Sequence, residues 1–314
     1  MYTDFFELKK PPFNLTPDPS FLFLPPKHRE ALAGLSYIIQ ERKGFVILSG
    51  EAGTGKTTLI NAVLSRLPAE RLESSMLLNP TLTPAEFLES VLLDFDLPDI
   101  PEGKPQRLWK LGNFLSRMHQ QGKLAVLVVD EAHKLSLEVL EEVRLLANFE
   151  SAEHKLLQVL LVGQPELDDM LNREDLWQLK QRIAMRLYID RLTPPEIEQY
   201  VDFRWTKAGS AQKAPFTADA LAGIVQWSSG IPRLINAICD TALLMAYSEE
   251  SALVGIDYVR AAAQNLALTG SMHRTAAAVL DSPKVVPMAV PANGTPKPNT
   301  SFLAHVADKY DVSS

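Results

Sequence analysis

Short runs of aliphatic residues alternate with segments of helical spacing between residues 27 and 192. The runs lie at 45–49, 75–79, 124–129 and 157–163. They contain few polar positions, which is typical of parallel strands that are buried on both faces. Between them, apolar residues recur every three or four positions and predict amphipathic helices. This alternation predicts an α/β fold in which a parallel sheet has helices on both faces.

The chain after residue 192 keeps the helical spacing but lacks the aliphatic runs. Thr193-Pro-Pro-Glu196 has the form of a capping box with proline at the first helical position, so a helix is predicted to begin there. Further helices are predicted at 218–227, 234–247 and 257–268. We therefore expect an α/β core over 27–192 and a small all-α lid domain over 193–269.

The two ends of the chain differ from the part between them. Residues 1–26 combine phenylalanines with many prolines, which exclude a regular helix, so we expect an extended arm that lies across the folded domain. Residues 270–314 are rich in proline and small residues and cannot bury a core. They are predicted to form a disordered, low-complexity tail.

The residues after the first aliphatic run have the order of a phosphate-binding loop. They are Gly50, Glu51, Ala52, Gly53, Thr54, Gly55, Lys56, Thr57 and Thr58, and they contain the pattern G-x-x-x-x-G-K-T. The glycines let backbone N–H groups turn toward a polyphosphate, and the following helix directs its positive end at the same anion. Lys56 is predicted to bind the outer phosphates and Thr57 to coordinate Mg²⁺. The arm over 1–26 either lies near the adenine of this nucleotide or packs without contacting it.

The aliphatic run at 124–129 ends in two adjacent carboxylates, Asp130 and Glu131. Ligands bind beyond the carboxyl ends of parallel strands, so both carboxylates are predicted to face the phosphate loop. Asp130 is placed to hold the water shell of Mg²⁺ while Glu131 polarises the attacking water. His133 is predicted to start a helix rather than to act in catalysis. The amide of Gln164, after the run at 157–163, can hydrogen-bond the attacking water or the terminal phosphate.

Amino-acid composition and net charge exclude few classes of function. The formal net charge of -7 argues against an extended nucleic-acid surface but allows a local basic patch. The single cysteine, Cys239, lies in an apolar helical pattern and is predicted to be a core residue. The sequence shows no secretory leader and no apolar run of about twenty residues. We expect a cytoplasmic protein without a transmembrane segment, peripheral to the inner membrane only through a partner.

Together these motifs resemble AAA+ ATPases of the ExeA/GspA type, which are associated with type II secretion. The resemblance covers about residues 1–269 and rests on the opening Tyr-x-x-Phe-Phe, the phosphate loop, Val-Val-Asp-Glu-Ala-His, Leu-Val-Gly-Gln-Pro-Glu-Leu and Ser-Gly-Ile-Pro-Arg-Leu-Ile-Asn. It implies a P-loop core that binds ATP and Mg²⁺ and hydrolyses ATP. It also implies Gln164 as first sensor, although Asn or Thr is commoner there, Arg233 as second sensor, and an arginine that reaches the neighbouring subunit's site.

Two arginines lie where the last core helix is predicted to meet the last strand, at the domain edge opposite the phosphate loop. Arg182 is our first candidate for the arginine that acts in trans and Arg186 our second, with ordinary surface salt bridges as the alternative for each. Arg233 follows a helix start, where the helix dipole disfavours a cation without a nearby anion. That anion is either a phosphate or a neighbouring Asp or Glu.

The sequence leaves three functional hypotheses open. The first is an ATPase that drives assembly of a secretion or envelope-export apparatus, as a homo-oligomeric ring or filament with an envelope or secretion-system protein as partner. The second is a DNA-associated ATPase regulator of transposition, of the target-selector type. The third is a nucleotide-dependent scaffold with little turnover, which needs neither Glu131 nor a trans-acting arginine and is therefore disfavoured.

Overall fold

The computed structural model describes residues 2–16, 18–78 and 81–268, so the tail predicted over 270–314 lies outside the described residues. The chain forms two compact units, which are described separately. One unit extends to Asp190 and contains the sheet. The other combines the first residues of the chain, up to Thr16, with the segment that begins at Arg191. Within the described residues, the chain therefore crosses between the units twice.

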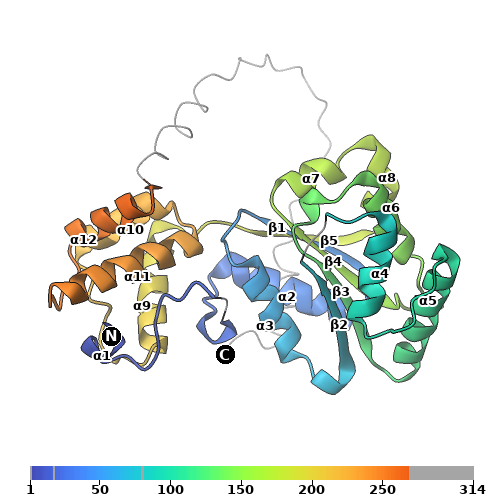
Figure 1. Cartoon of the computed structure of the whole chain (residues 1–314), viewed down its shortest axis with the longest axis horizontal. Helices are drawn as coiled ribbons and strands as arrows, with labels where there is room; N and C mark the ends of the chain where they lie inside the picture. Colours follow the sequence, from blue (N-terminus) through green and yellow to red (C-terminus); the bar gives the residue numbers. More distant parts are fainter. Residues whose placement is uncertain (1, 17, 79–80, 269–314) are drawn as a thin grey trace, which may run out of the picture. The chain divides into compact units, whose positions relative to one another are not determined.

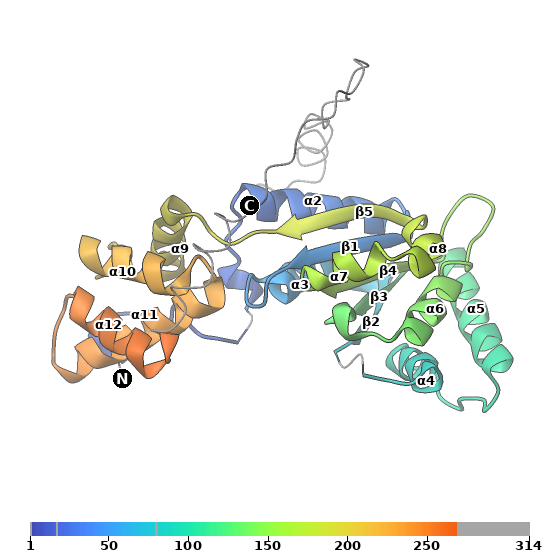
Figure 2. The same ribbon diagram turned by 90° about the horizontal axis from the view of Figure 1, so that it is seen from above.

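The sheet unit is built on five parallel strands in the order β2-β3-β4-β1-β5 (Figure 2). The strands are β1 (Phe45–Gly50), β2 (Leu72–Leu77), β3 (Leu124–Val129), β4 (Leu157–Gly163) and β5 (Ile183–Ile189). In the register of the central strands, Leu48 lies between Val162 and Leu187. The carboxyl ends of β1, β3 and β4 consequently share one edge of the sheet.

Helices cover both faces of this sheet (Figure 1). Helices α2 (Pro26–Gln40) and α3 (Lys56–Arg66) pack on the face that includes Val46 and Leu48. The opposite face, with Phe45 and Ile47, is covered by α4 (Pro84–Asp94), α5 (Lys104–Gln120), α6 (Leu137–Leu146), α7 (Glu166–Leu171) and α8 (Trp177–Lys180). Because successive strand residues point to opposite faces, strands with two covered faces are expected to be largely apolar. The central strands β1, β3 and β4 follow this pattern, whereas the edge strands β2 and β5 carry Glu73 and Arg186.

Short 3₁₀ turns join several of these elements. They are η1 (Pro19–Phe21), η2 (Ala69–Arg71), η3 (Ala132–Lys134) and η4 (Glu174–Leu176). The helix starts follow the local sequence pattern: Thr83 and Glu86 form a capping box at the start of α4, as Thr193 and Glu196 do at α9. The helix boundary predicted at Thr193 is thus confirmed.

The second unit contains the helices α9 (Pro194–Lys207), α10 (Ala218–Ser228), α11 (Pro232–Ser248) and α12 (Ile256–Asn265), together with the short α1 (Tyr2–Phe5). The first residues of the chain supply part of its core. Phe13 is fully buried and meets Phe216 edge to face, with 6.2 Å between the ring centroids. Phe6 meets Trp205 in the same way at 5.7 Å.

A buried arginine joins this N-terminal segment to α9. The Arg204 guanidinium donates hydrogen bonds to the Pro12 carbonyl (2.5 Å) and to the Tyr200 hydroxyl (2.9 Å), and that hydroxyl donates to Asn236 (2.8 Å). The sequence pattern treats residues 1–26 as one arm, whereas the structure groups residues up to Thr16 with the helical unit and the following ones with the sheet unit. A contact between this segment and adenine stays a prediction.

No helix in the described part of the chain is both long enough and apolar enough to cross a bilayer.

Candidate functional site

The phosphate-loop pattern lies between the end of β1 and the start of α3, as predicted. Glu51 to Gly55 form the turn, and Thr58 lies in the first turn of α3. Gly55 precedes α3 with φ 101, a left-handed conformation that residues with a Cβ rarely adopt. Thr54 is buried, and its hydroxyl donates to the Glu51 carbonyl (2.8 Å), which holds the loop closed on itself.

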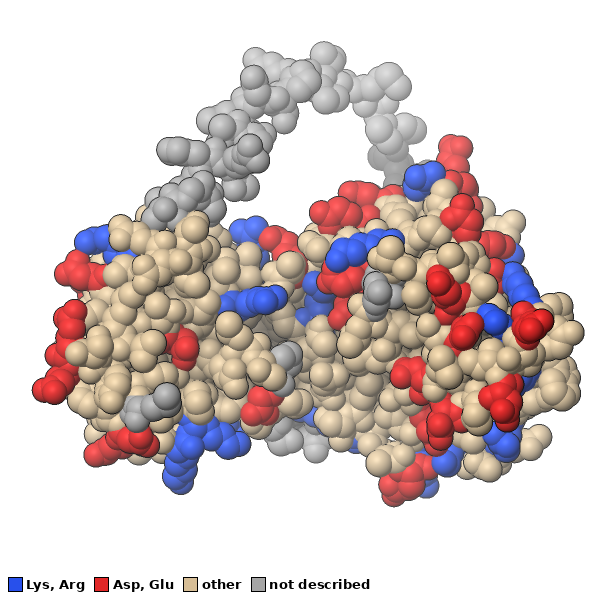
Figure 3. Space-filling view, in the orientation of Figure 1, with Lys and Arg blue, Asp and Glu red and all other residues tan. Residues whose placement is uncertain are grey.

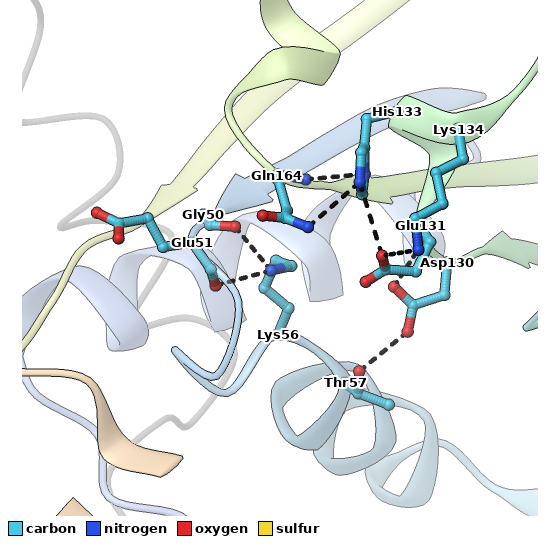
Figure 4. A network of polar contacts seen from close by, with 9 residues as sticks. All are labelled: Gly50, Glu51, Lys56, Thr57, Asp130, Glu131, His133, Lys134 and Gln164. Carbon is cyan, nitrogen blue, oxygen red and sulfur yellow. Dashed lines mark hydrogen bonds and ion pairs between the residues drawn. The ribbon is translucent and has the colours of Figure 1, made fainter. Parts of the chain in front are cut away.

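Lys56 is buried, and its ammonium lies inside this loop. Its Nζ donates to the carbonyls of Gly50 (2.7 Å) and Glu51 (2.9 Å) (Figure 4). Burial lowers the pKa of Lys56, and the nearby carboxylates of Asp130 and Glu131 oppose that shift. A positive charge is therefore held at the centre of the loop, close to two carboxylates.

Asp130 follows β3 and lies against α3. Thr57 donates its hydroxyl hydrogen to one carboxylate oxygen of Asp130 (3.0 Å), and the other oxygen accepts the N–H of Glu131 (2.8 Å). The backbone N–H of Asp130 donates to Leu77 on β2 (3.0 Å), which fixes the end of β3. Mg²⁺ prefers such hard oxygen ligands and takes only one or two from protein, so Thr57 and Asp130 fit a magnesium site.

Glu131 holds its carboxylate beside that of Asp130 in an unusual backbone conformation. Its φ of 52 is left-handed, which is uncommon for a residue with a side chain and often marks functional sites. Its Oε2 accepts a hydrogen bond from the Lys134 ammonium (2.9 Å), and this bond is the main reason why the pKa of Glu131 is lowered. The carboxylate is thus ionised near neutral pH, as a group that polarises water must be.

Two histidines contact the site, although the sequence pattern had assigned neither of them to it. His133 lies in the 3₁₀ turn η3, and its ring contacts Gln164: the Gln164 backbone N–H donates to Nδ1 (3.3 Å), and the side-chain amide lies 3.2 Å from Nε2. The buried His28 of α2 hydrogen-bonds the Thr54 carbonyl through Nε2 (3.1 Å). Helical spacing gave no signal for either contact, because each joins segments far apart in the chain.

Two of the three arginine candidates, Arg186 and Arg182, have local partners. Arg186, on β5, pairs with Asp168 of α7 at 2.6 Å, and its Nη2 is buried without a hydrogen-bond partner among the described residues. Arg182 donates to the Ala147 carbonyl at 3.4 Å. Arg233 is the second residue of α11 and belongs to the helical unit. The roles of all three in nucleotide chemistry stay predictions.

Comparison with known proteins gives two sequence matches. Residues 39–171 match a family of AAA domains. General secretion pathway protein A of Aeromonas hydrophila is 45% identical to the chain over 253 residues. The chain is thus similar to AAA-domain proteins and, over most of its length, to a protein of the ExeA/GspA type. The matched segment makes up 80% of this chain but 46% of the relative, so the chain spans about half of that protein's length.

Solved structures show the same fold. Cdc6p from Pyrobaculum aerophilum matches with a TM-score of 0.60 at 19% identity, over 78% of this chain and 70% of that one. The ORC2 protein of Aeropyrum pernix, solved as ADPNP-ADP complexes, matches with a TM-score of 0.57 at 17% identity, over 79% and 71% of the two chains. At such identities the likeness concerns the fold alone. It agrees with the predicted α/β core, a parallel sheet with helices on both faces.

Proposed function

We propose that this chain is an AAA+ protein that binds ATP with Mg²⁺ and hydrolyses it. The observation that carries the proposal is the meeting of Lys56, Thr57, Asp130 and Glu131 at one edge of the sheet, where each has hydrogen-bond or ion-pair partners. This combination of a phosphate-binding cation, oxygen ligands for a metal and an ionised carboxylate is what phosphoryl transfer to water requires.

Each residue then has a defined task. The backbone N–H groups of the loop and the Lys56 ammonium bind the phosphates, which replace the loop carbonyls as partners of Lys56. Thr57 and Asp130 hold the metal ion, which neutralises phosphate charge when bound. Glu131 accepts hydrogen-bond donation from the attacking water and orients it. Gln164 is the proposed first sensor and Arg233 the second.

We extend the proposal to the biological role: ATP turnover drives assembly of a secretion or envelope-export apparatus. The support is the 45% identity with general secretion pathway protein A. The active form would be a homo-oligomer, ring or filament, in which Arg182, or failing that Arg186, stabilises charge at the neighbouring subunit's nucleotide. An envelope or secretion-system protein would be the partner that brings the chain to the inner membrane.

Genetic complementation tests this role. Deletion of the gene in its host should cause proteins normally exported to accumulate inside the envelope, and the wild-type gene should restore export. A gene with Glu131→Gln, expressed at the same level, should fail to do so. Normal export in the deletion strain would remove the secretion role without affecting the ATPase proposal.

The DNA-associated alternative makes a different prediction, namely an affinity for DNA that falls steeply with salt. The chain has a net charge of -7, and on the face shown in Figure 3 the Lys and Arg side chains are interspersed with Asp and Glu. No basic stripe runs along that face. The affinity for DNA at 50 and 200 mM salt would therefore distinguish the two proposals. Under the secretion proposal we expect weak binding at both salt concentrations.

A further inference from the structure

The imidazole of His133 lies between the groups that follow strands β3 and β4 (Figure 4). On one side it contacts Gln164, and on the other its Nε2 lies 3.6 Å from Oε2 of Glu131. We propose that His133 is a positioning residue that couples the amide of Gln164 to the carboxylate of Glu131. This inference rests on the proposed ATP hydrolysis.

The hydrogen bonds fix which ring nitrogen carries the proton. A backbone N–H can only donate, so the Nδ1 that receives the Gln164 N–H at 3.3 Å must be an acceptor. The neutral ring therefore carries its hydrogen on Nε2. The side-chain nitrogen of Gln164 lies 3.2 Å from Nε2, where two donors would face each other. Since amide oxygen and nitrogen are assigned from their hydrogen bonds, we turn the amide over, which presents its oxygen to the Nε2 hydrogen.

The Nε2–H donor of His133 thus faces two acceptors, the amide oxygen of Gln164 and the carboxylate of Glu131. The Nε2–H is hydrogen-bonded to Gln164, while Glu131 lies just beyond hydrogen-bonding distance, so a shift of about 0.5 Å would bring the carboxylate into range. When the Gln164 amide turns to a phosphate or to the attacking water, Nε2–H becomes available to Glu131. The position of the carboxylate then depends on what Gln164 contacts, which is the coupling that we infer.

The surroundings of the ring favour orientation over free rotation. The His133 side chain is only 11% exposed. A Cβ at residue 163 would come within 3.3 Å of Nδ1, so the glycine before Gln164 leaves the space in which the ring lies. Lys134 shares Oε2 of Glu131 but is 54% exposed, and such an ion pair orients a carboxylate weakly.

Three substitutions at one position separate the two ring nitrogens. His133→Ala removes both, His133→Asn keeps an acceptor near the place of Nδ1, and His133→Gln keeps a donor near the place of Nε2. The matched control is His154→Ala, because His154 is exposed and lies in the loop before β4, outside the site. ATP affinity, kcat, KM and melting temperature would be measured on the full chain.

We expect His133→Ala to lower kcat roughly 10- to 100-fold, the range seen when an orienting partner is lost, with ATP affinity and KM within about twofold of wild type. His133→Gln should recover part of kcat, His133→Asn should not, and His154→Ala should behave as wild type. Unchanged kcat in His133→Ala would overturn the inference while leaving the ATPase proposal intact. Rescue by Asn with a restored melting temperature would assign a structural role and also overturn it.

The ring tautomer supplies a readout that does not depend on turnover. Nitrogen NMR of protein labelled at its six histidines, with His133 identified by its loss in His133→Gln, should show Nε2 protonated and Nδ1 free. Glu131→Gln should shift the Nε2 signal. The opposite tautomer would contradict the inference, whereas a wild-type protein that turns over no ATP would contradict the proposed function.

Discussion

At the scale of single residues, Lys56 shows how a positive charge is kept inside the phosphate loop before a nucleotide binds. Its ammonium is buried and bonded to two carbonyls of its own loop, an arrangement that offsets the cost of burying a cation. Phosphate oxygens are stronger partners than carbonyls because they are themselves charged. The same residue can therefore stabilise the free loop and bind the nucleotide.

Lys56→Ala should abolish ATP binding, because backbone N–H groups alone cannot offset the charge of the phosphates. Isothermal titration with Mg-ATP measures this directly. Lys43→Ala is the matched control, since Lys43 is exposed and lies just before β1, at the other end of the strand from the loop. Near-wild-type affinity in Lys56→Ala would disprove the phosphate-loop assignment.

The reactivity of the Cys239 thiol tests whether α11 is packed in the helical unit as the structure shows. Cys239 is fully buried on α11, and burial raises the pKa of its thiol. Thiol reagents react with the thiolate, so the native chain should not react with dithionitrobenzoate, while the denatured chain should release one equivalent from its single cysteine. Rapid reaction of the native protein would show that α11 is not packed as described.

The sequence alone located the site residues that are neighbours along the chain. Lys56 and Thr57 belong to one loop, and Asp130 and Glu131 end one strand, so spacing alone locates them. His133 was predicted only as a helix start because its partner Gln164 comes from another strand, 31 positions further on. Contacts of that kind depend on strand order, which no local pattern contains.

At the scale of elements, the helices and strands could be predicted from local signals, whereas the position of the N-terminal segment could not. Aliphatic runs and capping boxes are local signals, and most strands and helix starts lie where they occur. The strand predicted at 75–79 is the exception, because β2 begins three residues earlier and ends at Leu77. The place of residues 2–16 depends instead on contacts distant in sequence, such as those of Arg204 with Pro12 and Asn14, about 190 positions away. The composition of this segment indicated that it packs on the folded protein, but it did not indicate on which domain.

Arg204→Ala should destabilise the helical unit, because the Pro12 carbonyl and the Tyr200 hydroxyl would lose a buried donor. Each unsatisfied buried group costs about 1–3 kcal/mol. Urea unfolding followed by circular dichroism and by tryptophan fluorescence, to which Trp205 and Trp227 contribute in this unit, would show a lower midpoint. Arg260→Ala is the control: this exposed arginine pairs with the exposed Asp257 three residues before it, so little change is expected. Equal midpoints for both variants would contradict the role of Arg204.

At the scale of the whole molecule, the proposed mechanism requires more than one copy of the chain. If Arg182 or Arg186 acts at a neighbour's nucleotide, specific activity should rise with protein concentration. Mixing an Arg182→Ala subunit with a Glu131→Gln subunit should then restore part of the activity, because some interfaces pair an intact arginine with an intact Glu131. The Arg186→Ala subunit would be tested in the same way.

The outcome distinguishes the possible roles of these arginines. An arginine that serves its own subunit, or that only holds a local contact such as the pair between Arg186 and Asp168, gives no recovery on mixing. Mixed oligomers that form but stay inactive would therefore contradict the trans mechanism. Turnover that is independent of concentration in a monomer would contradict the oligomeric mechanism as a whole.

The central claim is that Glu131 activates water for ATP hydrolysis at a site formed by the phosphate loop and Asp130. The most direct measurement compares ATP binding and steady-state turnover in wild type and Glu131→Gln. The amide keeps the shape of the carboxylate but cannot polarise water, so we predict retained or tighter ATP binding with turnover reduced about 100-fold or more. Turnover equal to that of wild type would contradict the account.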